Sequence, residues 1–259
     1  MKQRPSFPAR LDSSVLSAKA KPVSNANAPQ GLGMDSSAVR QRMVQKLAAQ
    51  GLRDPRVLSA MGRVERHRFV DSALVNQAYE DTSLPIGLGQ TISKPGVVAR
   101  MLELLCNGVG GKLGRVLEIG TGCGYQAAVL SELATEVYTI ERLRGLHEKA
   151  RDNLRHLRLA HVHLLLGDGM LGYAQGAPYA AIVAAAGGEA LPTAWTDQLA
   201  VGGRLVAPVA QRTAIQGRAG EMSARATAQA LVVVDKTAAG LRQTILEAVH
   251  FVPLKSGLA

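Results

Sequence analysis

Residues 116–125 read Val-Leu-Glu-Ile-Gly-Thr-Gly-Cys-Gly-Tyr, and this stretch decides the fold. Its apolar start predicts a strand that ends at Ile119, and the pattern from Tyr125 onward predicts a helix. Between them, a glycine at every second position allows a tight turn in which the backbone can approach a ligand closely. This Gly-x-Gly-x-Gly spacing differs from the Gly-x-Gly-x-x-Gly of dinucleotide-binding folds, so a nicotinamide oxidoreductase is the least favoured interpretation.

The chain beyond this turn alternates short Val-, Ile- and Leu-rich runs with helical patterns. Such alternation is typical of a mostly parallel sheet that is covered by helices on both faces. We therefore predict an α/β fold with a doubly wound, mostly parallel sheet. The expected strands cover residues 115–119, 136–141, 162–166, 179–184, 203–208, 230–235 and 244–252, and the expected helices 125–133, 146–157 and 193–199. Residues 211–229 are expected to form a loop.

The chain before the turn divides into two parts. Residues 1–36 are rich in Pro, Ser, Ala and Asn without apolar periodicity, so we expect a disordered tail. From Ser37 helical spacing returns, and helices are expected near 39–50, after Asp54-Pro55, and over 95–105. Residues 37–110 are thus predicted to be a helical cover with a substrate loop at 84–89, and residues 111–259 the cofactor-binding sheet.

Composition limits the possible classes of protein. The 259 residues carry 30 Lys and Arg against 20 Asp and Glu, a net charge of +10 that is scattered along the chain, so we expect no nucleic-acid partner. No apolar run approaches the roughly 20 residues of a membrane helix. The 2 cysteines do not suffice for a disulfide framework or a four-ligand zinc site, which indicates a cytoplasmic protein without a metal.

Acidic side chains near the ends of three strands point to a nucleoside ligand. Glu118 lies in the first strand, and Glu141 closes the second, where an acid accepts hydrogen bonds from both ribose hydroxyls. Asp168 follows the third strand between two glycines and is suited to contact an adenine edge. Because carboxyl ends of parallel strands meet at one crevice, this arrangement favours S-adenosylmethionine over NAD as the cofactor.

Residues 78–95, 117–125 and 141–142 strongly resemble protein-L-isoaspartate O-methyltransferases, above all in the Gln-Thr-Ile-Ser-x-Pro segment that begins at Gln90. The similarity extends to segments 66–70, 167–169, 202–209 and 249–254. It implies a seven-stranded, Rossmann-like methyltransferase sheet. It also implies transfer of the methyl group of S-adenosyl-L-methionine to the α-carboxylate of L-isoaspartyl residues in damaged proteins and peptides, by an enzyme expected to be a monomer.

The resemblance also implies a set of site residues. Ser93 would be the catalytic residue, donating a hydrogen bond that orients the substrate carboxylate, although a serine here is also placed to cap the helix that starts near Pro95. Substrate contacts are expected from Asp81, Gln90, Thr91 and Ile92. Cofactor contacts are expected from Glu118, Gly120, Thr121, Gly122, Gly124, Glu141, Arg142, Asp168 and Gly169.

The sequence departs from the family pattern at two positions. Ala180 and Ala184 stand where the family commonly has Asp and Thr, which puts local hydrogen bonding on the strand and one pocket contact in question. The positive charge keeps a nucleic-acid or small-molecule methyltransferase of the same fold as an alternative, although residues 184–187 offer nothing to hold an amino group. A non-catalytic binding module that keeps the cofactor fold is the alternative from another class.

Overall fold

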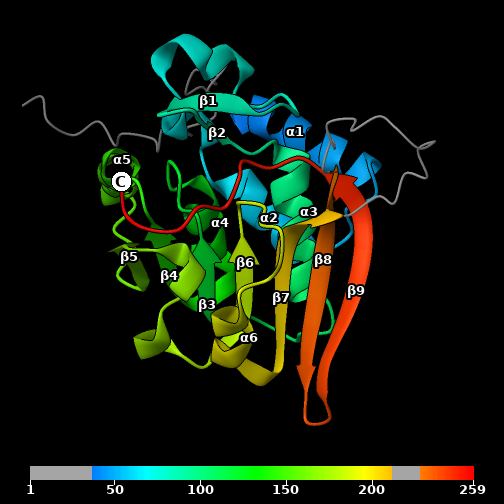
Figure 1. Cartoon of the computed structure of the whole chain (residues 1–259). Coiled ribbons are helices and arrows are strands. Elements are labelled where there is room, and N and C mark those ends of the chain that lie inside the picture. The colour runs from blue at the N-terminus through cyan, green and yellow to red at the C-terminus, as the bar shows by residue number, and fades with distance from the viewer. Residues whose placement is uncertain (1–36, 212–227) are drawn as a thin grey trace, which may run out of the picture. The chain divides into compact units, whose positions relative to one another are not determined.

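The computed structural model describes residues 37–211 and 228–259, and its centre is a seven-stranded sheet (Figure 1). The strands are β3 (Leu113–Ile119), β4 (Ala134–Glu141), β5 (Val162–Leu166), β6 (Tyr179–Ala184), β7 (Leu199–Gln211), β8 (Ala228–Thr237) and β9 (Gly240–Val249). The predicted tail 1–36 lies outside the described residues.

The order of the strands creates a crevice beside β3. The sheet runs β5-β4-β3-β6-β7-β8-β9; neighbours from β5 to β7 are parallel, whereas β8 is antiparallel to both β7 and β9. The chain builds outward from β3 to β5 and then returns to the other side of β3 with β6. Such a reversal is where open sheets bind ligands, at the carboxyl ends of the strands. The predicted doubly wound, mostly parallel sheet is confirmed.

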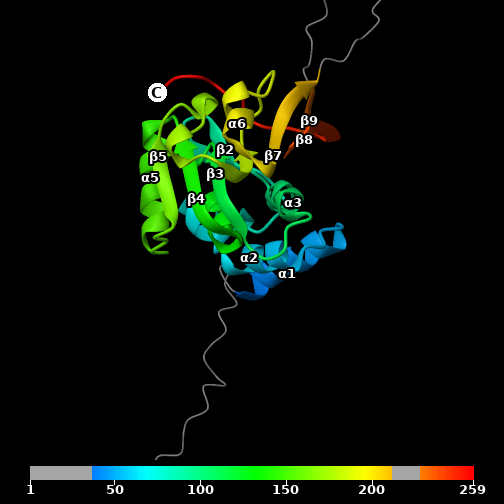
Figure 2. The same cartoon turned by 90° about the horizontal axis from the view of Figure 1, so that it is seen from below.

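Helices cover both faces of this sheet (Figure 2). They are α1 (Ser37–Ala49), α2 (Pro55–Arg63), α3 (Pro95–Cys106), α4 (Tyr125–Leu133), α5 (Arg144–Arg155) and α6 (Thr193–Gln198), with short 3-10 turns at Arg66–Phe69, Ser72–Gln77, Gly169–Leu171 and Ala174–Gly176. α3, α4 and α5 pack on one face, and α1 and α2 form an outer layer on α3 and α4. On the other face, Trp195 of α6 packs with Tyr179 and Ile182 in a second apolar cluster.

The substrate loop predicted at 84–89 is instead part of a small hairpin. β1 (Leu84–Gly87) pairs antiparallel with β2 (Gln90–Ile92). The prediction of a loop was wrong because Pro85, Gly87 and Gly89 indicate turns, yet Leu84, Ile86 and Ile92 point inward and are buried. The reversal uses Leu88 and Gly89, whose φ angles are 51° and 68°, as a tight two-residue hairpin turn needs.

The end of the chain also differs from the prediction. β9 spans 240–249 rather than 244–252, so residues 250–252 leave the sheet. Of the loop expected at 211–229, Gln211 belongs to β7 and residues 228–229 belong to β8, while residues 212–227 lie outside the described part. Strand pairing therefore extends further along β7 and β8 than their central apolar runs suggested.

Candidate functional site

A cavity opens at the carboxyl ends of β3, β4 and β6, beside the point where the strand order reverses. Its lining comes from the β1–β2 hairpin with the start of α3, the glycine turn with α4, the end of β4 with the start of α5, Gly169 after β5, residues 185–186 after β6, and residues 252–255. The lining residues from the predicted site are Gln90, Thr91, Ile92, Ser93, Gly120, Thr121, Gly122, Glu141, Arg142 and Gly169.

The glycine turn is tied directly to the end of β4. The backbone N–H of Gly122 donates to Oε2 of Glu141 at 2.9 Å, and its φ of 57° is one that residues with a side chain rarely adopt. Oε1 of Glu141 accepts from the N–H groups of Arg142 and Leu143, both at 2.9 Å. Three backbone donors therefore fix a buried carboxylate at the cavity wall, where Glu141 was predicted to be.

Glu118 lies beneath the turn rather than in the cavity wall. Its side chain is fully buried, and Oε2 accepts from the hydroxyl of Thr139 at 2.5 Å, which in turn lies 2.6 Å from the hydroxyl of Thr121. Burial raises the pKa of Glu118 from 4.5 to about 8. Among the described residues, Oε1 of Glu118 and Nε2 of Gln126 are buried without a hydrogen-bond partner.

Two predicted cofactor residues do not line the cavity because they make other contacts. At Gly124, a β-carbon would lie 3.1 Å from Cγ of Leu154, so this glycine allows α4 and α5 to pack closely. Asp168 accepts from the N–H of Met170 at 2.9 Å through Oδ1 and from the N–H of Gly257 at 2.7 Å through Oδ2.

The hairpin and the start of α3 form the other side of the cavity. Ser93 is half-buried, and its hydroxyl has no hydrogen-bond partner within residues 37–211 and 228–259. It does not cap α3. Asp81 does so instead, accepting from the N–H of Gly96 at 2.7 Å. Asp81 lines a neighbouring groove along α3 rather than the cavity, so the structure separates it from the other predicted substrate residues.

A second hollow joins the cavity at Ser93. It runs between the start of α3 and the end of β9, and shares four lining residues with the cavity: Thr91, Ser93, Ala185 and Val252. Its remaining wall includes Lys94, Val97 and His250. The cavity at the strand ends and the groove beside β9 thus adjoin, and Ser93 lies in the wall of both.

The nucleophilic side chains nearest the glycine turn stay protonated at neutral pH. Burial raises the pKa of the Cys123 thiol to about 11 and that of the Tyr125 phenol to about 12. The Tyr125 hydroxyl donates to Sδ of Met61 at 3.6 Å, inside the helical layer. Neither group can act as a base in this cavity near pH 7.

Sequence reasoning missed several lining residues. Gln126 and Ala185 adjoin motifs that were recognised, but nothing in their type indicated a binding role. The last residues of the chain were missed entirely: Val252, Pro253, Leu254 and Lys255 line the cavity. The signal for them was the family-like ending at 249–254, which has no chemistry that would suggest a site.

The two departures from the family pattern lie outside the cavity wall. Ala184 is fully buried in the apolar cluster around Trp195. Ala180 lies on β6 close to Gly114, where a β-carbon on that glycine would be 3.1 Å from Cβ of Ala180. Ala185 and Ala186, not Ala184, line the cavity.

No helix in residues 37–211 or 228–259 is both long and apolar enough to cross a membrane. Over the same ranges, no group of three or more His, Cys, Asp and Glu side chains is arranged to hold a metal ion.

Residues 38–259 match the family model for protein-L-isoaspartate(D-aspartate) O-methyltransferase. The chain is 58% identical over 231 residues to a protein-L-isoaspartate O-methyltransferase of Methylibium petroleiphilum, covering 88% of this chain and 81% of the relative. It is 58% identical over 229 residues to that of Leptothrix cholodnii, covering 88% of this chain and 77% of the relative.

Solved structures agree with these sequence relatives. One protein-L-isoaspartate O-methyltransferase matches with a TM-score of 0.71 and 26% identity, over 85% of this chain and 67% of that chain. A Plasmodium falciparum protein described as a putative member of the same family, in complex with S-adenosyl-L-homocysteine, matches with a TM-score of 0.69 over 83% of this chain and 98% of that chain. At 22% identity, the second match supports the fold alone.

Proposed function

The chain belongs to the protein-L-isoaspartate(D-aspartate) O-methyltransferase family, and from this membership we propose that the cavity at the ends of β3, β4 and β6 is its active site. The enzyme transfers the methyl group of S-adenosyl-L-methionine to the α-carboxylate of L-isoaspartyl residues in damaged proteins and peptides. The products are the methyl ester and S-adenosyl-L-homocysteine.

The cavity wall fits the cofactor. Glu141 ends β4 with a fixed, buried carboxylate, which suits the two hydroxyls of a ribose. The backbone of Gly120, Thr121 and Gly122 leaves room for close approach, and Ile119, Ile140, Leu143 and Leu146 offer an apolar surface for flat groups. When bound, the cofactor supplies a methyl group activated by the positive charge on its sulfur.

The chain's own residues need only align the reacting groups. A carboxylate is already ionised at neutral pH, so its attack on an activated methyl group requires no strong base. This agrees with the raised pKa values of Cys123 and Tyr125, which leave both groups protonated. Ser93 would donate its free hydroxyl proton to the substrate carboxylate and hold it in line with the methyl group.

The observation that carries this proposal is that two hollows adjoin and share Ser93 in their walls. One hollow reaches Glu141 and the glycine turn, and the other runs along the end of β9. Methyl transfer needs the cofactor in one space and a peptide side chain in the other, with their reacting atoms in contact. Lys94 lines the groove, and its positive charge favours an acidic residue.

The test is methyl transfer from labelled S-adenosylmethionine to two peptides that differ only in L-isoaspartate or L-aspartate, near neutral pH. Transfer to the first peptide alone supports the proposed function. Cofactor binding without transfer to either peptide would contradict it and would turn attention to RNA and small-molecule acceptors.

For Ser93, we expect Ser93→Ala to lower kcat about 10- to 100-fold, because one oriented hydrogen bond to a charged group is lost, while cofactor affinity is retained. Ser72→Ala is the matched control, since Ser72 is exposed and does not line the cavity. Turnover and cofactor binding should both be measured. Unchanged turnover in Ser93→Ala would remove Ser93 from the mechanism.

The proposed substrates are damaged proteins and peptides that contain L-isoaspartate, and we propose a cytoplasmic location. The basic residues are scattered along the sequence, and their distribution does not indicate a surface that binds nucleic acid. Duplex DNA at physiological salt is therefore not expected to inhibit peptide methylation, because weak electrostatic binding is screened there.

A further inference from the structure

Residues 252–259 form an extended segment along the carboxyl ends of the strands, which we call the C-terminal strap. In Figure 1 it is the red chain that passes over the ends of β6, β3 and β4 and stops beside α5. Its first part pairs with Gly187 just after β6: the Gly187 N–H donates to the Val252 carbonyl at 2.9 Å, and the Leu254 N–H donates to the Gly187 carbonyl at 2.8 Å. The strap therefore starts on the far side of the cavity from β4.

The other end of the strap is anchored on the residues that follow β4 and β5. The N–H of Gly257 donates to Oδ2 of Asp168 at 2.7 Å, and Nε of Arg142 donates to the Gly257 carbonyl at 2.8 Å. Two backbone bonds complete the anchor, from the Ala259 N–H to the Arg142 carbonyl at 3.0 Å and from the Arg144 N–H to the Ala259 carbonyl at 2.9 Å. Asp168 and Arg142 thus bind the strap, although the sequence suggested only cofactor contacts for them.

Between its two anchors, the strap supplies part of the cavity wall. Val252, Pro253, Leu254 and Lys255 line the same cavity as Gly120 and Glu141. We propose that the C-terminal strap is a wall of the cofactor site, and that Gly257 is a positioning residue that holds this wall in place through Asp168 and Arg142. This inference rests on the proposed function, because it assumes that the cofactor occupies this cavity.

Gly257 is suited to this role by its backbone. Its φ is 76°, in the region that favours glycine, and no atom lies within 4 Å of the position that a β-carbon would take. A substitution there strains the backbone without a steric clash. The residue is also exposed on the surface, so its replacement leaves the apolar core intact.

The strap should affect how fast the product S-adenosylhomocysteine leaves the cavity. Because the strap forms part of the cavity wall, a strap that is held less firmly encloses bound S-adenosylhomocysteine less tightly. Loss of the Gly257 anchor therefore speeds dissociation of this product and raises the KM for S-adenosylmethionine. The KM for the peptide changes little, because the strap beyond Val252 does not line the peptide groove.

The chain contains its own reporter for this test. Its 1 tryptophan is Trp195, which is buried and donates from Nε1 to the Gly169 carbonyl at 2.8 Å. Gly169 lines the cavity next to Asp168. Stopped-flow tryptophan fluorescence should follow S-adenosylhomocysteine dissociation, and isothermal titration calorimetry gives its affinity independently.

The experiment compares Gly257→Pro with Gly240→Ala and the wild type, all as full chains. Proline removes the N–H donor and cannot adopt a positive φ. Gly240 is the control, since it also has a positive φ of 125° and no atom within 4 Å of its β-carbon position, but lies in the β8–β9 turn. Gly257→Ala is the second variant, which keeps the N–H donor but strains the turn.

We expect S-adenosylhomocysteine to dissociate about tenfold faster from Gly257→Pro, because this variant loses the charge-assisted hydrogen bond to Asp168. Dissociation from Gly257→Ala, which keeps the N–H donor, should be less affected. The KM for S-adenosylmethionine should rise, with the peptide KM, the thermal midpoint and the control unchanged. Wild-type binding of S-adenosylhomocysteine with an unchanged rate in both variants overturns the strap proposal alone. A wild-type protein that does not bind it overturns the proposed function as well.

Discussion

At the scale of single residues, Glu141 does two things with one carboxylate. It accepts three backbone N–H groups that shape the glycine turn and the chain after β4, and it faces the cavity. We expect Glu141→Ala to raise the dissociation constant of S-adenosylhomocysteine about 10- to 100-fold, because a fixed charged acceptor is lost. Calorimetric titration checks this. Glu136→Ala is the control, since Glu136 lies on the same strand outside the cavity; an unaltered constant in Glu141→Ala would refute its role.

Because Glu118 is buried, it makes the free energy of unfolding depend on pH. Its pKa rises from 4.5 in the unfolded chain to about 8 in the folded one because it is buried. Between these values the folded state holds a proton that the unfolded state has lost, so this residue lowers the free energy of unfolding as pH rises. Below the lower value and above the higher one, its contribution is constant.

We therefore expect Glu118→Gln to gain stability relative to the wild type as pH rises from 5 to 8, by at most about 1.4 kcal/mol per pH unit. The measurement is urea unfolding of both proteins at several pH values in this window. Because every other titrating group is common to both, the difference isolates Glu118. A difference that stays flat, or that falls with pH, would show that Glu118 is ionised in the folded protein.

The sequence predicted the position of those candidate residues whose contacts are local. Glu141 lies 19 positions from its partner Gly122, but both are fixed by strands that the sequence already indicates. Asp168 and Asp81 were placed less well, because their acceptor oxygens bind backbone donors 89 and 15 positions away. The backbone N–H group that a carboxylate binds across the fold depends on tertiary packing. The pattern of residue types along the sequence therefore does not predict this partner.

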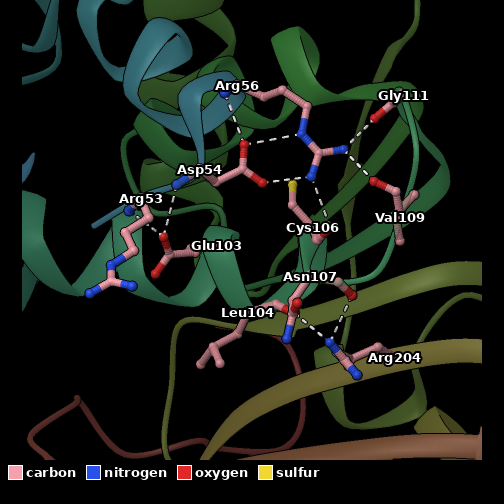
Figure 3. A network of polar contacts seen from close by, with 10 residues as sticks. All are labelled: Arg53, Asp54, Arg56, Glu103, Leu104, Cys106, Asn107, Val109, Gly111 and Arg204. Atoms are coloured by element: carbon pink, nitrogen blue, oxygen red, sulfur yellow. Dashed lines mark hydrogen bonds and ion pairs between the residues drawn. The ribbon is translucent and has the colours of Figure 1, made fainter. Parts of the chain in front are cut away.

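At the scale of elements, α3 is held at both ends, and this positions Ser93 just ahead of it. Asp81 caps its first turn through Gly96. At the end of α3 and in the loop that follows it, Arg56 and Arg204 donate to backbone carbonyls, as Figure 3 shows. The carbonyl acceptors are those of Leu104, Cys106, Asn107, Val109 and Gly111, at 2.6 to 3.0 Å.

We expect Arg56→Met to lower the free energy of unfolding by about 1–3 kcal/mol, since three carbonyls and Asp54 lose a shared donor. Arg63→Met on the same helix is the control: its ion pair with Glu132 is more exposed and should contribute little. Chemical unfolding measures both. An equal loss in the two variants would argue against a specific clamp on α3.

Elements with strong periodicity were predicted well, and elements defined by pairing were not. The limits of α4, β5 and β6 agree with the expectation, because each is bounded by turn residues or a change of period. The β1–β2 hairpin was missed because its strands are too short to show an alternation of apolar and polar residues. The two strands are defined by their antiparallel pairing with each other instead. The shift of β9 has the same cause: its register is set by β8, not by its own sequence.

At the scale of the whole molecule, the two free edges of the sheet bear on association between copies. β5 and β9 are the outermost strands. β5 has only 5 residues, and β9 exposes charged side chains at Arg242 and Glu247. Short edges and edge charges discourage pairing between sheets, because a partner strand would bury charged side chains. The net charge of +10 adds repulsion between identical chains.

We therefore expect a monomer of 27.3 kDa in sedimentation velocity at physiological salt, over a wide range of protein concentration. The apolar residues Leu241 and Ile245 on β9, each 54% exposed, are the feature that works against this expectation. Ile245→Lys serves as the comparison, since it replaces one of these two apolar side chains and Ile245 does not line the proposed active site. If the wild type sediments as a dimer and Ile245→Lys as a monomer, the edge of β9 is an interface, and edge charge alone does not keep these chains apart.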